Sequence, residues 1–264
     1  MIDLSQLKRS FMTEYSKENE RIDDLDLKGL HIIQNPDYFC FGIDAVLLAW
    51  FASPFIHPNT HVMDLGTGSG ILPLLVYGRT GARRIEALEI QDQMVELARR
   101  NVAMNQLEDV ITVHHGDICH PTPQMLSTNF DVILSNPPYM RMDRGMKNAT
   151  SAVSIARHEI ACTLDDVVFF AKRTLKDRGK LFMVQRADRL SDLLCSLRKH
   201  GVEAKRLCAV HPYVDKPANL ILVEAMRQGK SYMNIDPPLV VYNEGGSYTQ
   251  AINEIYGCVE PKKR

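Results

Sequence analysis

The chain has 264 residues, of which 45% are hydrophobic, and it carries a formal net charge of −1 at neutral pH. That hydrophobic content is normal for a globular core, and no stretch approaches the roughly 18 uninterrupted apolar residues of a membrane span. The first residues lack the apolar centre of a signal peptide, and the six cysteines include no C-x-x-C pair. We therefore expect reduced thiols in a cytoplasmic protein that does not contact a membrane.

Stretches with the pattern of strands alternate along the chain with stretches that have the pattern of helices. The expected strands cover residues 61–65, 85–90, 110–115, 130–135, 180–185, 205–210 and 219–226. The expected helices lie at 45–51, from residue 71, at 163–179, at 188–200 and at 248–256. Asp44 should cap the first helix, Gly179 should end the third, and 117–129 is expected as a loop. This alternation predicts a doubly wound, mostly parallel α/β sheet of seven strands with helices on both faces.

A glycine-rich loop follows the first expected strand, with the sequence Asp-Leu-Gly-Thr-Gly-Ser-Gly. Gly66, Gly68 and Gly70 allow positive φ and let the backbone approach a ligand closely. In the G-x-G-x-x-G register Ile71 stands at the third glycine position, so the loop is a poor dinucleotide fingerprint, and no P-loop lysine follows. Asp64, at the strand end, would repel a pyrophosphate and instead suits a cationic or zwitterionic ligand.

The next three strands also end in polar side chains. Glu89 lies about 20 residues beyond the glycine loop, the spacing at which a carboxylate takes ribose hydroxyls. Asp117 could accept a hydrogen bond from an adenine amino group, and Asn136 follows the fourth strand. Either acid alone would more simply be a helix-capping or turn residue. In a doubly wound sheet, however, these strand ends share one rim, where ligands bind, so the series favours a ligand site.

Asn136 opens the segment Asn-Pro-Pro-Tyr, directly after a short apolar strand. Neither proline can donate a ladder hydrogen bond, so the strand must stop and a rigid loop follow. The Asn136 side-chain oxygen and the Pro137 carbonyl are both acceptors, and together they could hold a planar amino group by its two hydrogens. Tyr139 would stack on the flat group that carries this nitrogen. The segment alone could be an ordinary proline-rich turn, but its place after the glycine loop favours the ligand interpretation.

These motifs resemble those of the class I S-adenosylmethionine-dependent methyltransferases, in particular those that carry NPPY and methylate planar nitrogens. The chain is most similar to one family, the tRNA1(Val) adenine-N6 methyltransferases, over nearly its whole length. The segments that carry the resemblance are 41–48, 64–70, 88–91, 136–139, 156–159, 216–220 and 237–239. It implies a Rossmann-like fold and transfer of a methyl group from S-adenosylmethionine to N6 of the adenine next to the anticodon of tRNA1(Val).

The resemblance also implies roles for particular residues. Phe41 would lie against the methionine end of the cofactor, and Asn136 would touch both cofactor and target base. Catalytic roles fall to Asn136, Pro137 and Tyr139, and the cofactor is expected to contact Phe41, Asp64, Gly66, Gly68, Gly70, Glu89, Asp117 and Asn136. Contacts to substrate RNA would come from Arg141, Arg144, Lys147, Lys216 and Asn219.

The same resemblance suggests how the chain is divided and what it binds. Residues 1–30 are expected as an N-terminal extension, 31–228 as the methyltransferase domain, and 229–264 as a C-terminal appendix packed on that domain. The expected partner is the anticodon loop of tRNA, bound by a monomer or weak dimer. The nine histidines show no metal-ligand spacing with cysteines or carboxylates, so no metal is expected.

Three other functions stay open. A family that methylates a glutamine amide of translation release factors has a similar glycine loop and NPPY, but places a sizeable helical domain before that loop. DNA adenine methyltransferases usually carry a separate target-recognition domain. A non-catalytic binding module would not need Asp64, Glu89 and NPPY together. The net charge of −1 argues against nucleic acid as a partner unless basic residues gather locally.

Overall fold

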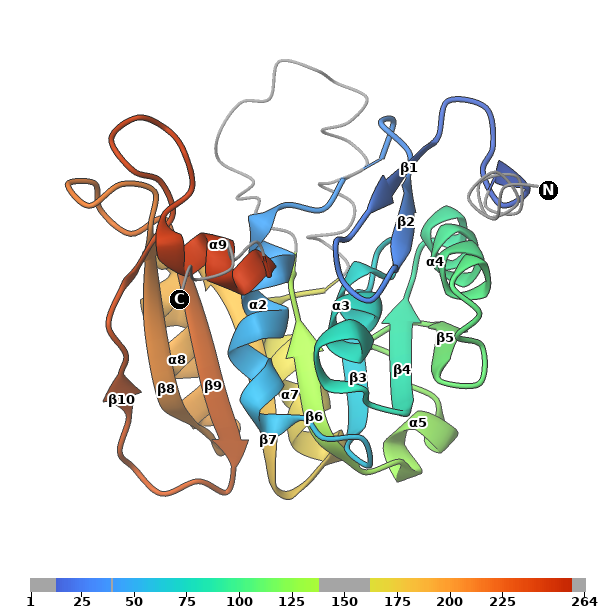
Figure 1. Cartoon of the computed structure of the whole chain (residues 1–264). Helices are drawn as coiled ribbons and strands as arrows, with labels where there is room; N and C mark the ends of the chain where they lie inside the picture. Colours follow the sequence, from blue (N-terminus) through green and yellow to red (C-terminus); the bar gives the residue numbers. More distant parts are fainter. Residues whose placement is uncertain (1–12, 39, 138–161, 258–264) are drawn as a thin grey trace.

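The computed structural model describes residues 13–38, 40–137 and 162–257 (Figure 1). Five parallel strands run side by side through its main sheet, and they appear in the spatial order β5 (Ile111–His115), β4 (Arg84–Glu89), β3 (His61–Leu65), β6 (Phe130–Ser135) and β7 (Leu175–Arg186). β9 (Leu220–Arg227) pairs antiparallel with β7, and β8 (Val202–His211) pairs antiparallel with β9. The predicted mostly parallel, doubly wound sheet is confirmed.

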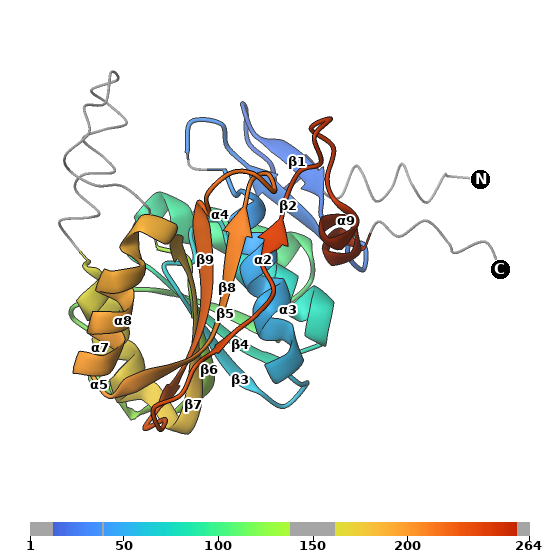
Figure 2. The same cartoon turned by 90° about the vertical axis from the view of Figure 1, so that its left-hand side faces the viewer.

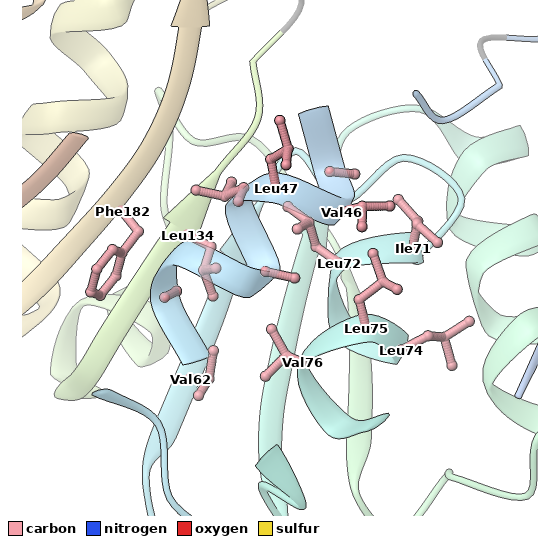
Figure 3. Close-up of a cluster of buried hydrophobic side chains, with 14 of the residues drawn as sticks. Val46, Leu47, Val62, Ile71, Leu72, Leu74, Leu75, Val76, Leu134 and Phe182 are labelled. Atoms are coloured by element: carbon pink, nitrogen blue, oxygen red, sulfur yellow. The ribbon is translucent and has the colours of Figure 1, made fainter. Parts of the chain in front are cut away.

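Helices cover both faces of this sheet (Figure 2). One layer holds α2 (Ile43–Ala52), α3 (Ile71–Thr80) and α4 (Asp92–Met104), and the other holds α5 (Pro123–Ser127), α7 (Leu164–Thr174) and α8 (Leu190–Lys199). All five residues of β3 are buried, as expected for a central strand covered on both faces. Figure 3 shows the first layer of the core, where α2 and α3 side chains such as Leu47 and Leu75 pack over Val62 and Leu134.

The third expected helix is shorter than predicted. α7 ends at Thr174 and not at Gly179, because Leu175 already pairs with Phe130 of β6. The register then shifts in a bulge, so that Val132 faces Lys180. A Cβ at Gly179 would lie 2.9 Å from the Lys176 carbonyl oxygen, so this glycine permits the bulge and does not end the helix. Strand pairing of a fully buried leucine has overridden the local helical pattern.

Two further local expectations were wrong. Asp44 does not cap α2, since Gly42 occupies the N-cap and Asp44 lies in the first turn, where it accepts from its neighbour Ala45. The expected loop at 117–129 contains α5, which starts where the Thr122 side chain accepts from Met125 N–H. Pro123 fits there because the first turn of a helix needs no N–H donor.

A hairpin of β1 (Arg21–Asp24) and β2 (His31–Gln34) precedes the main sheet and spans the expected domain boundary at residue 30. At the other end of the chain, β10 (Asn234–Ile235) and β11 (Leu239–Val240) add to the edge of β8, and α9 (Gln250–Tyr256) packs beside α2. The described C-terminal residues therefore pack on the main sheet. The domain boundaries themselves stay a prediction. Over the described residues, none of the helices has the length and apolar character needed to cross a membrane.

Candidate active site

The strand register brings the ends of β3, β4, β5 and β6 to one level. Leu65 is aligned with both Leu88 of β4 and Ser135 of β6. The first residues of the glycine loop are bonded to the neighbouring strand, because Gly66 N–H and Thr67 N–H donate to the Leu88 carbonyl at 2.9 and 3.0 Å. Glu89 is aligned with His115, so Asp117 follows β5 on the same side. Asn136 and Pro137 come directly after Ser135, and both are partly buried.

The glycine loop holds three left-handed residues, with φ of 74° at Gly66, 56° at Gly68 and 83° at Gly70. An added Cβ at Gly66 would have no atom within 4 Å, whereas one at Gly70 would lie 3.3 Å from Cβ of Ala98 in α4. Gly66 therefore faces open space in which a ligand could approach the backbone, and Gly70 lets the loop pack closely on the helix.

Asp64 is the least satisfied polar side chain of the rim. It is 1% exposed, and neither of its carboxylate oxygens makes a hydrogen bond of good geometry within the described residues. Burial raises the pKa of Asp64 to about 7, the nearby Thr67 hydroxyl opposes this shift, and the charge of Glu89 adds to it. A buried carboxylate without a partner is costly, so the site is suited to a cationic group that would pair with it.

Glu89 ties the glycine loop to the neighbouring strand end. Its Oε2 accepts from Gly68 N–H at 2.9 Å, and its Oε1 accepts from Ile90 N–H and Gln91 N–H at 2.9 and 3.0 Å. The local role that the sequence left open for this residue is thus present. A carboxylate offers about four lone-pair sites, so these bonds are compatible with ribose hydroxyls as well.

Asp117 also has a local role. Its oxygens accept from Cys119 N–H and from the His120 ring, each at 2.8 Å, and this shapes the turn after β5. Burial works against the hydrogen bonds from His120 and Cys119, but the net effect lowers the pKa of Asp117. The side chain is therefore a carboxylate held at the rim, and its contact with an adenine stays a prediction.

The remaining predicted residues are spread more widely. Phe41 packs partly buried against the core, and its N–H donates to the Gln34 side chain at 3.2 Å. Lys216 and Asn219 lie exposed in the connection between β8 and β9, where Asn219 N–H donates to the Val210 carbonyl. Four residues with predicted roles lie outside the described residues, namely Tyr139, Arg141, Arg144 and Lys147.

Sequence reasoning missed two residues beside the loop. Asn101 of α4 is fully buried, accepts from Ile33 N–H at 2.6 Å and donates to the Ser69 carbonyl of the glycine loop at 2.9 Å. The sequence does contain a signal for this role, because an asparagine on the apolar face of a helix indicates a buried polar contact. Ile90 is 40% exposed directly after Glu89, which leaves an apolar side chain at the rim beside the position expected for the cofactor.

Together, the doubly wound sheet and the site at its rim define the class of S-adenosylmethionine-dependent methyltransferases. The family model of the methyltransferase small domain matches residues 41–200. A Porphyromonas gingivalis protein named tRNA1(Val) (adenine(37)-N6)-methyltransferase is 32% identical over 187 residues, which cover 69% of this chain and 72% of that protein. A Phocaeicola vulgatus protein of the same name is 35% identical over 64% of this chain and 69% of its own length. The chain belongs to the tRNA1(Val) (adenine(37)-N6)-methyltransferase family.

Solved structures support the fold. An Agrobacterium tumefaciens structure described as a predicted O-methyltransferase aligns with a TM-score of 0.65 at 19% identity, over 81% of this chain and 95% of its own. A Pyrococcus horikoshii structure in complex with MeSAdo aligns with a TM-score of 0.56 at 14% identity, over 81% of this chain and 74% of its own. At these identities the likeness concerns the arrangement of the sheet and helices and not the substrate.

Proposed function

We propose that this methyltransferase methylates the exocyclic N6 of an adenine in tRNA, at the position next to the anticodon that its relatives are named for. The observation that carries the proposal is the place of Asn136 and Pro137. Both follow β6 on the rim that holds the glycine loop, in a chain 32% identical to a protein of that name. Two acceptors at this point suit a planar amino group, which adenine offers.

The residues of the rim fit S-adenosylmethionine. Asp64, buried and without a good partner in the described part of the chain, suits the positive charge of the methionine end. Glu89 would accept from the ribose, and Asp117 from the adenine amino group of the cofactor. The exposed Ile90 would cover one face of that adenine. When bound, this cofactor supplies a methyl group on a positively charged sulfur.

Asn136 and Pro137 would prepare the target nitrogen for the transfer. The lone pair of an exocyclic adenine nitrogen is delocalised into the ring, which makes it a poor nucleophile. When the Asn136 side-chain oxygen and the Pro137 carbonyl accept its two N–H bonds, a pyramidal nitrogen with a localised lone pair is favoured. Correct alignment of the reacting groups can lower the barrier by several kcal/mol. The proton would leave to water, so no dedicated base is required.

Tyr139 would hold the target base after it leaves its stack. An adenine inside an anticodon loop must be splayed out before its amino group can reach the rim, and an aromatic ring then replaces its neighbours. Since Tyr139 lies outside the described residues, this role rests on the sequence alone.

The decisive experiment offers the purified protein total tRNA and purified release factor side by side, with radiolabelled S-adenosylmethionine. We expect label in tRNA, and mass spectrometry of the digested nucleosides should identify N6-methyladenosine. Label that enters the release factor but not tRNA would overturn the proposal and support the glutamine-methylating alternative. In the same assay, an adenine-containing DNA duplex is offered instead of tRNA to test the weaker alternative of a DNA methyltransferase.

A further inference from the structure

Three possible metal ligands meet beside the rim. Cys119, Cys162 and Asp166 each offer one donor atom, and these three atoms lie within 4.8 Å of one another. Cys119 belongs to the turn that follows β5, two residues beyond Asp117, while Cys162 immediately precedes the N-cap of α7. All three side chains are partly buried. Across the described ranges, no other group of three such ligands meets this distance.

The fold assembles this group from separate parts of the chain. Cys119 and Cys162 lie on either side of β6 in sequence, so neither the spacing of cysteines nor that of histidines indicates a metal. Asp166 is the third residue of α7 and forms a capping box with Thr163. Its Oδ2 accepts from Thr163 N–H at 2.8 Å and from the Thr163 hydroxyl at 2.6 Å. A carboxylate has two oxygens, so Oδ1 could bind a metal while the cap stays intact.

We propose that Cys119, Cys162 and Asp166 form a zinc site that ties the turn after β5 to the start of α7. Two sulfurs and one carboxylate oxygen are donors that Zn²⁺ accepts, and atoms within 4.8 Å of one another need only small side-chain movements to reach one tetrahedral metal. Three protein ligands leave the fourth corner to water. The set has too much sulfur for Mg²⁺ or Ca²⁺, which prefer oxygen ligands alone.

The protonation of the two thiols sets how the metal would bind. Zinc binds cysteine as the thiolate, so each thiol must give up its proton when the metal binds. In the metal-free chain the Cys162 thiol donates to the Thr163 carbonyl. Binding of one Zn²⁺ forms two zinc–sulfur bonds and releases two protons to solvent. Zinc affinity should therefore increase with pH, and binding in weak buffer should release acid.

The consequence for the molecule is a cross-link at one side of the rim. Asp117 shapes the turn that also holds Cys119, because its Oδ1 accepts from Cys119 N–H at 2.8 Å. A metal on Cys119 would fix this turn against α7, which lies in the same helix layer as α5. Because zinc would bind the folded chain and only weakly the unfolded one, it should raise the melting temperature.

The test uses the full chain, reduced and stripped of metal with a chelator. Zinc is titrated against a chromophoric chelator, and cobalt is added separately as a spectroscopic probe. We expect one zinc per chain and a sulfur-to-cobalt charge-transfer band. In Cys119→Ser and in Cys162→Ser the zinc affinity should be at least about tenfold lower and the sulfur-to-cobalt band weaker. Cys195→Ser is the matched control, since Cys195 is exposed on α8, is not one of the three grouped ligands and should not matter.

Asp166 needs its own control because it also caps α7. Asp166→Asn should weaken zinc binding, whereas Thr163→Ala removes the capping partner, keeps the ligand and should leave zinc affinity unchanged. The proposal is overturned if the wild-type chain binds no zinc, or if Cys119→Ser binds it equally well. It is also overturned if the two cysteines form a disulfide under air and zinc offers no protection. None of these readouts uses methyl transfer, so they stand apart from the proposed function.

Discussion

Asp64 is a buried carboxyl group whose ionisation costs the folded protein stability. Its pKa in the folded chain is raised to about 7 from an ordinary value of 3.8. The folded state therefore holds this proton more tightly than the unfolded state. The stability that Asp64 contributes is present in full below about pH 4 and is lost as the pH rises through about 7, by about 1.4 kcal/mol per pH unit between these values.

The raised pKa of Asp64 leads to a prediction about both the stability and the cofactor affinity of Asp64→Asn. The variant should be more stable than the wild type above about pH 7, because it has no charge to bury, yet it should bind S-adenosylmethionine at least about tenfold more weakly. Wild-type affinity should rise roughly tenfold between about pH 6 and pH 8 as the carboxylate ionises, while the variant stays flat. Thermal melts and calorimetry across pH measure both. A variant that binds as tightly as the wild type would rule out the pairing of Asp64 with a cationic group.

Asn136 and Tyr139 should differ in which step they affect. Asn136→Ala should lower turnover far more than cofactor affinity, because its contact to the target nitrogen matters most in the transition state. Tyr139→Ala should mainly weaken binding of the target base, and Tyr139→Phe should be tolerated because the ring does the stacking. Steady-state kinetics with tRNA separates these effects. If Tyr139→Phe is as damaging as Tyr139→Ala, the hydroxyl matters and stacking is the wrong explanation.

Elements with a strong pattern could be predicted from the sequence, and elements that depend on partners could not. β3 and β6 have the predicted bounds because short apolar runs between turn residues have one stable arrangement in this fold. α7 was predicted too long because the pairing of Leu175 with Phe130 is not visible in a local pattern. The β1–β2 hairpin was not predicted at all. Its second strand is bonded by the side chains of Asn101 of α4 and of Asn105, the C-cap of that helix, and a local pattern does not show such contacts.

The shared rim of the candidate site could be predicted in outline for a related reason. Asp64, Glu89, Asp117 and Asn136 share a rim because parallel strands end at the same edge, which sequence order alone implies. The hydrogen bonds that Glu89 and Asp117 make to nearby backbone could not be assigned, since local and ligand-binding uses of a carboxylate look alike in sequence. The meeting of Cys119 with Cys162 was equally hidden, because it depends on how α7 lies against the turn after β5.

Asn101 and Asn105 allow a matched comparison of two side chains that bond the same strand, β2. Both anchor β2. Asn101 accepts from Ile33 N–H at 2.6 Å, while Asn105 accepts from His31 N–H at 2.9 Å and donates to the His31 carbonyl at 2.7 Å. Only Asn101 also donates to Ser69 in the glycine loop. Either alanine variant leaves buried or partly buried backbone groups unpaired and should cost about 1–3 kcal/mol of stability, measured by denaturant unfolding. Only Asn101→Ala should also weaken S-adenosylmethionine binding, by roughly tenfold. Equal losses of cofactor affinity in both variants would show that the loop does not depend on this bond.

Over the whole molecule, charge is the feature that fits tRNA least well. The net charge is −1, so any attraction for phosphate must come from a local group of basic residues. The sequence points to Arg141, Arg144 and Lys147, which closely follow the proposed base-holding segment. By contrast, Lys172, Arg173 and Arg178 lie exposed on and after α7, and they serve as a control of equal charge.

The final prediction compares two triple variants. Replacing Arg141, Arg144 and Lys147 by alanine should lower tRNA affinity and flatten its dependence on salt, because each lost phosphate contact removes about one unit of the logarithmic slope. Binding of S-adenosylmethionine should not change. Replacing Lys172, Arg173 and Arg178 by alanine lowers the net charge equally and should leave the slope nearly intact. Filter binding over a salt series measures both. If the two variants lose affinity equally, net charge rather than a local basic group governs tRNA binding, and the segment after NPPY is not the RNA contact.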